Sequence, residues 1–219
     1  RVFFWSDFQA QLFPKVTPIT LSAVPSSDAK QVGAKSVAPK PSPFRSPHQQ
    51  TMAEEEAPCW DNTLEEWCIS EGHACAAALA QQEDGMFYAA APQADEVGWG
   101  LLFKEEHEEI IMQEDMSEKP MQVNETTCLK NLVDKGACLQ EGLWFGGEKY
   151  KVVQKDMAVE EGEHTLGWIL ATRSKKGVHI IVTNAQILVV NWDEEKGQTA
   201  GNCKKVALAF GAYLVGMGY

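Results

Sequence analysis

Residues 177–219 show two hydrophobic patterns in succession. Two apolar, β-branched runs, 178–183 and 187–192, flank a short polar break at 184–186, and this pattern predicts a tight hairpin. From Cys203 onward apolar residues recur every three or four positions, which predicts one stripe of a helix. The end of the chain is therefore expected to be a hairpin followed by a terminal helix.

The same reasoning predicts the elements upstream. Trp60, Leu64 and Trp67 fall on one stripe of a first helix over residues 61–71, which Gly72 ends. A short helix is expected over 95–104, and Asn124 caps a helix that runs to 135. Strands are predicted at 74–81, 86–91, 143–145, 150–154 and 166–172. About seven short strands in hairpin order, with a helix at each end, predict an α+β fold in which helices cover an antiparallel sheet.

Residues 1–51 differ in composition from the rest of the chain. They hold seven of the ten prolines, and six Lys/Arg against two Asp/Glu. Such a segment buries too little apolar surface to offset its ordering entropy, so we expect a disordered, basic Pro/Ser/Ala-rich extension. The domain is expected to span residues 52–219.

Three interpretations of this extension stay open. Met52 lies eight residues before Trp60, so residues 1–51 can be an over-extended gene model or translated leader. A basic, acid-poor leader also fits an organelle transit peptide. Alternatively, Pro39, Pro41 and Pro43 favour polyproline II, and this segment can return to bind the domain's own surface.

Residues 104–123 are rich in acids around a small apolar patch at 110–112. They form either a solvated charged loop or a protruding acidic hairpin that touches a partner. His107 does not begin a His-Glu-x-x-His zinc motif, because residue 111 is Ile.

Charge and motifs narrow the possible functions. Residues 52–219 carry 13 Lys/Arg against 29 Asp/Glu, a net charge of −16, and such a field repels nucleic acid. The six cysteines lack zinc-ligand spacing, so we expect reduced structural thiols and no metal. Phosphate-binding loops and nucleophile motifs are absent, so neither an enzyme nor a cofactor is expected. The pair Gly146-Gly147 is too short to cradle phosphate and is more consistent with a bulge.

Two groups of side chains are candidates for binding. If the first and last helices pack side by side on one sheet face, the aromatic rings near them either form core or line a groove that suits polyproline. These rings are Trp60, Trp67, Tyr88, Tyr213 and Tyr219. The second group is basic, and strand alternation predicts that Lys149, Lys151 and Lys155 share a face. Its other members are Arg173, Lys175, Lys176, Lys204 and Lys205. Lys204 and Lys205 are expected at the start of the last helix, where cations oppose the macrodipole at a local cost in free energy.

Three motifs resemble the profilin family, in its order and spacing. Trp60 opens a helix as the profilin amino-terminal Trp does, residues 142–150 resemble the Gly-Leu-x-x-Gly-Gly-x-Lys-Tyr strand, and residues 192–219 resemble a profilin carboxyl end. The run after Trp99 through residues 104–109 is similar to the insertion of apicomplexan-type profilins.

The resemblance implies six or seven antiparallel strands, with the terminal helices on one face and shorter helices on the other. It implies a cytoplasmic, cytoskeletal, monomeric protein that binds monomeric actin and proline-rich proteins such as formins, with weak phosphoinositide binding. By this likeness the proline-contacting residues are Trp60, Tyr88, Tyr213 and Tyr219, with Trp67 left as core. The actin-contacting residues are Lys149, Lys151, Arg173, Lys175, Gly201, Lys204 and Lys205.

Two departures from the family pattern bear on affinity. Thr63 stands where profilins carry a Tyr, which removes one stacking face, and Gln154 stands where animal profilins carry an Arg. A different class of protein, a PAS-like sensor or scaffold domain, is the alternative; it requires a ligand cavity behind the sheet.

Overall fold

A seven-stranded antiparallel sheet organises the domain. The computed structural model describes residues 59–112 and 116–219, so the expected 1–51 extension lies outside the described residues. The strand order is β2-β1-β9-β8-β7-β6-β5, so the first and last strands of the domain, β1 and β9, are neighbours. The strands are β1 (Ala76–Gln81), β2 (Phe87–Ala91), β5 (Leu143–Phe145), β6 (Glu148–Glu161), β7 (His164–Arg173), β8 (Lys176–Val182) and β9 (Gln186–Asp193).

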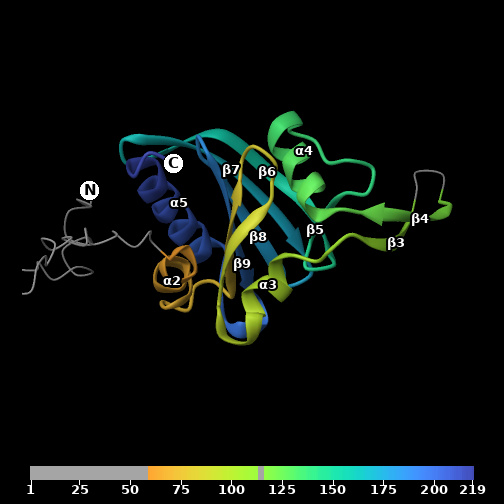
Figure 1. Cartoon of the computed structure of the whole chain (residues 1–219), viewed down its shortest axis with the longest axis horizontal. Helices are drawn as coiled ribbons and strands as arrows, with labels where there is room; N and C mark the ends of the chain where they lie inside the picture. Colours follow the sequence, from red (N-terminus) through yellow and green to blue (C-terminus); the bar gives the residue numbers. More distant parts are fainter. Residues whose placement is uncertain (1–58, 113–115) are drawn as a thin grey trace, which may run out of the picture. The chain divides into compact units, whose positions relative to one another are not determined.

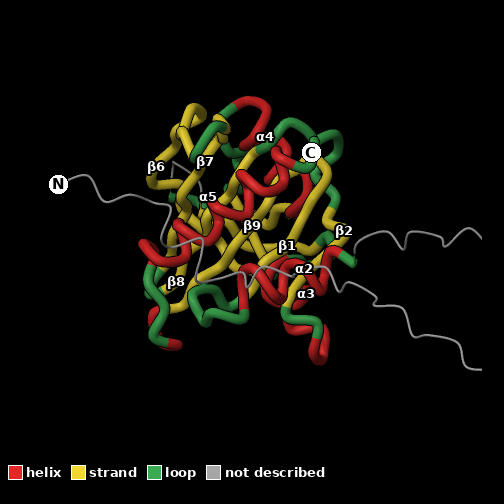
Figure 2. Tube along the Cα trace, turned by 90° about the vertical axis from the view of Figure 1, so that its left-hand side faces the viewer, coloured by secondary structure: helices red, strands yellow, loops and turns green. Residues whose placement is uncertain are grey.

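Helices cover both faces of this sheet (Figures 1 and 2). On one face lie α2 (Trp60–Leu64), the π-helix η1 (Glu65–Ile69) and α5 (Ala200–Gly216), which bury Leu64 and Phe210 against the sheet. On the other lie α3 (Val97–Leu102), preceded by the 3₁₀ turn η2 (Ala94–Glu96), and α4 (Glu125–Lys135). The α+β prediction, with the terminal helices on one face, is confirmed.

The strand pattern explains how one sheet serves two cores. On β1, Ala77 and Leu79 pack in the core beneath α5, whereas Ala76, Ala78 and Ala80 pack in the core beneath α3 and α4. Small side chains let the neighbouring helix approach closely: a Cβ on Gly98 of α3 would lie 2.5 Å from the carbonyl carbon of Ala91.

Three predicted details were wrong. The β6–β7 hairpin runs well past residue 154, because its outer part is exposed and polar and carries no apolar run. The pair Gly146-Gly147 is not a bulge but the two-residue turn between β5 and β6, with φ of 58° and 76°. Helix α5 begins at Ala200 rather than Cys203, since the Thr199 hydroxyl caps it by accepting the Asn202 N–H.

Two further observations concern the helices and the cysteines. None of the described helices is long and apolar enough to cross a membrane. All six cysteines are free thiols, and Cys68, Cys128 and Cys203 are buried as small apolar side chains.

Candidate functional site

The first and last helices bring aromatic rings together. Trp60 at the start of α2 meets Tyr219 edge to face, with ring centroids 5.2 Å apart, and Trp67 of η1 stacks on Tyr213 of α5 at 4.8 Å. Tyr88 of β2 packs against the same core and lies near Tyr219. We call these five residues the aromatic cluster.

Local contacts hold this cluster in position. The Asp61 carboxylate accepts the Ala90 N–H at 2.7 Å, which ties the start of α2 to β2. At the other end, the Tyr219 N–H donates to the Leu214 carbonyl at 3.0 Å, so the terminal ring is fixed on the end of α5. The two anchors hold Trp60 and Tyr219 in mutual contact.

The rings of the cluster are half-buried rather than sealed from solvent. The Tyr88 hydroxyl is buried and has no hydrogen-bond partner among the described residues. Burial raises the pKa of Tyr88, and the nearby Tyr219 raises it further, so the phenol keeps its proton. A buried O–H donor without an acceptor favours a ligand that brings a carbonyl.

Trp67 was expected to be core because it matches no profilin contact position. It packs against the core beneath α5, is half-buried, and stacks on Tyr213 with an interplanar angle of 28°. Its spacing of seven residues from Trp60 places the two rings on one helical stripe. Trp67 supplies a ring one turn away from Thr63, where the family's second aromatic residue is missing.

The basic residues of β6 and β7 line one open groove. Lys149 and Lys151 alternate along β6, and with Arg173 at the end of β7 they border a groove of about 630 Å³. Arg173 lies over the Tyr150 ring, with its guanidinium carbon 6.0 Å from the ring centroid, and pairs with Glu148. Lys149 and Lys151 are exposed and form no ion pair with any described residue.

Lys155 does not share this face, contrary to the prediction. The register changes between Val152 and Gln154, so one extra residue opposes β7 and the side chains from Gln154 to the next shift, after Asp156, point to the other face. Lys155 therefore pairs with Ile169, and its ammonium donates to the Gly136 carbonyl at the end of α4. Strand alternation alone could not reveal this bulge.

The turn between β7 and β8 is less basic than its sequence indicates. The Lys175 ammonium lies 2.8 Å from the Glu195 carboxylate, with both side chains 61% exposed, and Lys176 lies 3.7 Å from Asp193. The exposed Lys175–Glu195 pair is weak and solvent-screened, so a partner can replace it at small cost, whereas Asp193 in the second pair is buried.

The start of α5 carries Gly201, Lys204 and Lys205. Gly201 lies in the first helical turn rather than in the preceding loop, is exposed, and has open space where a Cβ would stand. Lys204 was expected to pay an electrostatic cost at the helix start, but it lies beyond the first turn, where the macrodipole effect has faded. Its ammonium instead lies 3.3 Å from the centroid of the Trp168 ring, a cation–π contact.

His179 fixes this corner of the molecule. Its Nε2 donates to the Ala200 carbonyl at 2.8 Å and its Nδ1 accepts the Trp168 indole N–H at 3.1 Å, so both ring nitrogens are used by the neutral tautomer. Burial lowers the pKa of His179 to about 4, and the nearby Lys204 lowers it further, against the hydrogen bond to Ala200. The Trp168 ring that holds Lys204 is therefore positioned by a neutral imidazole.

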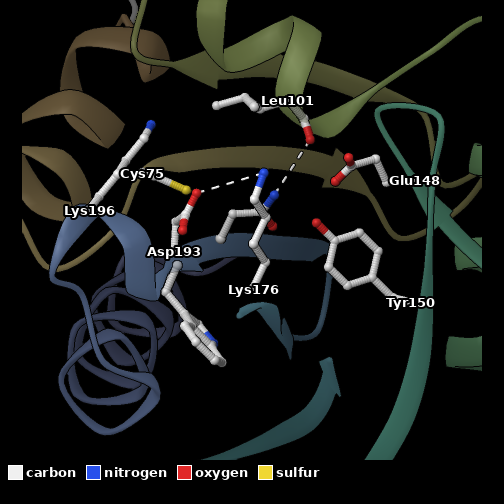
Figure 3. A pocket seen from close by; sticks show the side chains of 9 residues that line it. Cys75, Leu101, Glu148, Tyr150, Lys176, Asp193 and Lys196 are labelled. Carbon is white, nitrogen blue, oxygen red and sulfur yellow. Dashed lines mark hydrogen bonds and ion pairs between the residues drawn. The ribbon is translucent and has the colours of Figure 1, made fainter. Parts of the chain in front are cut away.

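A small cavity lies at the end of the sheet where β1 and β8 begin and β9 ends (Figure 3). Its volume is about 190 Å³, and Tyr150, Asn191 and the margin residue Lys196 contribute to its lining. Within the described ranges, no group of three or more His, Cys, Asp or Glu side chains is arranged to hold a metal ion.

The acid-rich segment is a hairpin rather than an unstructured loop. Strands β3 (His107–Met112) and β4 (Glu118–Val123) pair antiparallel and extend away from the main sheet (Figure 1); residues 113–115 are outside the description. Ile111 and Val123 are buried against Trp144, whereas Ile110 is 69% exposed. Contact of this hairpin with a partner stays a prediction.

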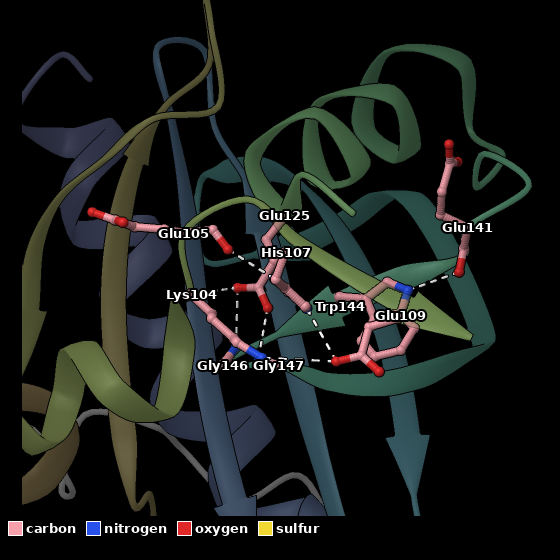
Figure 4. Close-up of polar contacts among 9 residues, drawn as sticks. All are labelled: Lys104, Glu105, His107, Glu109, Glu125, Glu141, Trp144, Gly146 and Gly147. Carbon is pink, nitrogen blue, oxygen red and sulfur yellow. Dashed lines mark hydrogen bonds and ion pairs between the residues drawn. The ribbon is translucent and has the colours of Figure 1, made fainter. Parts of the chain in front are cut away.

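Glu125 attaches the root of this hairpin to the domain (Figure 4). Its carboxylate accepts three backbone N–H groups: Lys104 at 2.8 Å, Gly146 at 3.0 Å and Gly147 at 2.6 Å. Burial raises the pKa of Glu125, while these hydrogen bonds oppose the shift. One buried side chain on α4 thus joins three separate segments.

Comparisons with known proteins agree with this architecture. The family model described as Profilin matches residues 58–219. A profilin of Plasmodium berghei is 33% identical over 162 residues, covering 71% of this chain and 92% of the relative, and one of Plasmodium falciparum is 31% identical over 169 residues, covering 74% and 97%.

Solved profilins were also compared. Acanthamoeba castellanii profilin IB has a TM-score of 0.49 at 17% identity, and a Schizosaccharomyces pombe profilin has 0.48 at 19%; each comparison covers 73% of this chain and 99% of the other. The likeness noted in the sequence to the apicomplexan-type branch is confirmed by the two Plasmodium relatives. By its family match and by these relatives, the chain belongs to the profilin family.

Proposed function

We propose that this domain binds monomeric actin through its basic surface and proline-rich segments, such as those of formins, through its aromatic cluster. As a member of the profilin family it is not an enzyme, and the family assignment replaces the PAS-like alternative. In this role it regulates actin assembly in the cytoplasm as a monomer.

The contact between Trp60 and Tyr219, with both rings half-buried, is the main support for binding of proline-rich segments, which we call the proline half of the proposal. Polyproline II presents flat rings that stack on aromatic faces and carbonyls that have no internal partner. The buried Tyr88 hydroxyl fits a ligand carbonyl, and the half-buried rings of Trp60 and Tyr219 fit the proline rings. We include Trp67 with the four residues expected from the sequence.

Tryptophan fluorescence with a proline-rich peptide tests the proline half. We expect the emission to change on titration, and Trp60→Ala to weaken binding about tenfold, equivalent to about 1.4 kcal/mol. Trp99→Phe on α3, on the opposite face of the sheet, is the matched control and should bind normally. Unchanged emission with the unaltered protein would contradict this half.

The proposal of actin binding rests on exposed lysines, of which Lys149 also lies over the Trp144 ring, with its ammonium 5.7 Å from the ring centroid. Lys149, Lys151 and Lys205 are exposed and form no ion pair with a described residue, which is notable in a domain of net charge −16. Lys204 and Lys151 belong to the same side of the sheet: Trp168, beneath Lys204, and Thr172, the partner of Lys151, lie about 13 Å apart along β7. Arg173, Lys175 and Gly201 complete the proposed surface.

Assembly of pyrene-labelled actin tests the actin half. We expect excess protein to slow assembly, and the double variant Lys149→Gln/Lys151→Gln to need about tenfold more protein for the same effect. Lys130→Gln is the control, because that lysine lies on α4 and pairs with Asp134. If the unaltered protein at excess leaves assembly unchanged, the actin half is wrong.

Phosphoinositide binding is proposed to be weak. The basic surface attracts an anionic headgroup, but the net charge of −16 over residues 52–219 opposes approach to an anionic membrane.

A further inference from the structure

We propose that the cavity at the end of the sheet binds a small carboxylate that carries a neighbouring hydroxyl or amine. This site is separate from the aromatic cluster and borders the proposed actin surface, because Tyr150 also lines the basic groove and Glu148 pairs with Arg173. The cavity of about 190 Å³ has the volume of about six water molecules and is smaller than the roughly 300 Å³ of the smallest drug-sized pockets. A molecule the size of lactate fits these dimensions.

Asn191 provides a buried acceptor whose orientation is fixed. Its side chain is 4% exposed, and Nδ2 donates to the Leu101 carbonyl at 3.4 Å. Because the Leu101 carbonyl is an acceptor, the amide atom that faces it is the nitrogen Nδ2, and the amide oxygen Oδ1 takes the other position. This oxygen has no donor among the described residues. An unmatched buried acceptor is costly, so the cavity favours an occupant with an O–H or N–H group at this point.

The charges around the cavity leave one cation uncompensated. Lys176 forms an ion pair with Asp193 at 3.7 Å, and Glu148 forms an ion pair with Arg173. Lys196, on the short helix η3 (Glu194–Lys196), forms no ion pair with a described residue. The two lysines and two carboxylates of the lining balance in formal charge, but Lys196 is not engaged by either carboxylate, so a singly charged anion is favoured beside it.

Tyr150 adds a neutral donor on the opposite wall. The side chain is 5% exposed, and its hydroxyl points toward Lys176 (Figure 3). Burial, followed by the nearby Glu148, raises the pKa of Tyr150 to about 12, so the phenol remains protonated. Ammonium and phenol groups together suit a carboxylate, while Asn191 Oδ1 receives the neighbouring donor.

Nuclear magnetic resonance of the ¹⁵N-labelled full chain tests the proposal with three probes. Lactate carries both groups, propionate lacks the hydroxyl, and glycerol lacks the carboxylate. We expect lactate to shift the Asn191 side-chain amide and the Cys75 backbone amide, whose N–H donates to the Asn191 carbonyl. Propionate should bind about tenfold more weakly than lactate, and glycerol should produce no shift.

Two lysine variants separate a specific site from general attraction of anions. Lys196→Gln removes the uncompensated cation from an exposed position, and we expect about fivefold weaker lactate binding. Lys135→Gln, the same change on an exposed lysine of α4, should leave binding unaltered.

Three outcomes would overturn the proposal. No shift with any probe would mean that the cavity holds water only. Equal shifts with lactate and propionate would remove the role of Asn191, and equal affinity in the Lys196 variant would remove the anion site.

Discussion

At the scale of single residues, buried polar groups in this domain are used to fix elements in place. His179 is 1% exposed, yet both of its ring nitrogens are matched by the Trp168 indole and the Ala200 carbonyl. An imidazole used in this way must stay neutral, because the Nδ1 that accepts the indole N–H cannot also carry a proton. Stability of the fold is therefore linked to pH.

We predict that acid weakens the domain through His179. Its pKa is about 4 in the folded state and 6.5 without burial, so the unfolded state binds a proton first as pH falls. The unfolding free energy should therefore drop as pH falls below about 6.5, with a loss of about 3 kcal/mol complete near pH 4.

Denaturant titrations at several pH values measure this loss. His179→Gln is the control variant, because a glutamine can accept from the indole and donate to the carbonyl without titrating. The same acid sensitivity in wild type and variant would assign it to other groups.

At the scale of elements, Glu125 is the main link between the acidic hairpin and the rest of the domain. The Lys104 N–H it accepts precedes β3, and the two glycine N–H groups form the turn between β5 and β6. The hairpin's orientation therefore depends on this side chain together with the packing of Ile111 and Val123 against Trp144.

We predict that Glu125→Ala destabilises the domain by about 3 kcal/mol, because three buried N–H groups lose their acceptor. Hydrogen exchange at Lys104, Gly146 and Gly147 should accelerate, and denaturant unfolding gives the free energy. Asp134→Ala on the same helix removes only an exposed ion pair and should cost less than about 0.5 kcal/mol. Similar losses in the two variants would contradict this account.

The elements show where sequence reasoning succeeds. The stripe of Trp60, Leu64 and Trp67 and the two apolar runs before α5 are local patterns, and the helices and strands they predicted are present. The three N–H groups bound by Glu125 come from residues 21 and 22 positions away, and the bulge that turns Lys155 over comes from pairing with β7. Contacts of this kind leave no periodic trace in the sequence.

The same contrast between local patterns and long-range contacts applies to the binding residues. The encounter of Trp60 with Tyr219 could be anticipated once the two helices were expected on one face. The stacking of Trp67 on Tyr213 and the placement of Lys204 over Trp168 depend on side-chain directions that only the packed structure defines.

At the scale of the whole molecule, all described residues belong to one compact unit that buries a core on each face of its sheet. We predict that residues 52–219 alone unfold with a midpoint within about 2 °C of the full chain, because the cores need no further residues. Thermal unfolding followed by circular dichroism checks this, with the full chain as reference. A markedly lower midpoint would mean that residues 1–51 contribute to folding.

The position of Lys204 has a practical consequence. Its ammonium lies 3.3 Å from the centre of the Trp168 ring, so a partner that draws this lysine away alters the electric field on the indole. Trp60 and Trp67 belong instead to the aromatic cluster, where they contact Tyr219 and Tyr213. The domain thus carries tryptophan reporters for both proposed binding events, Trp168 for actin and Trp60 with Trp67 for proline-rich segments, and none requires an attached dye.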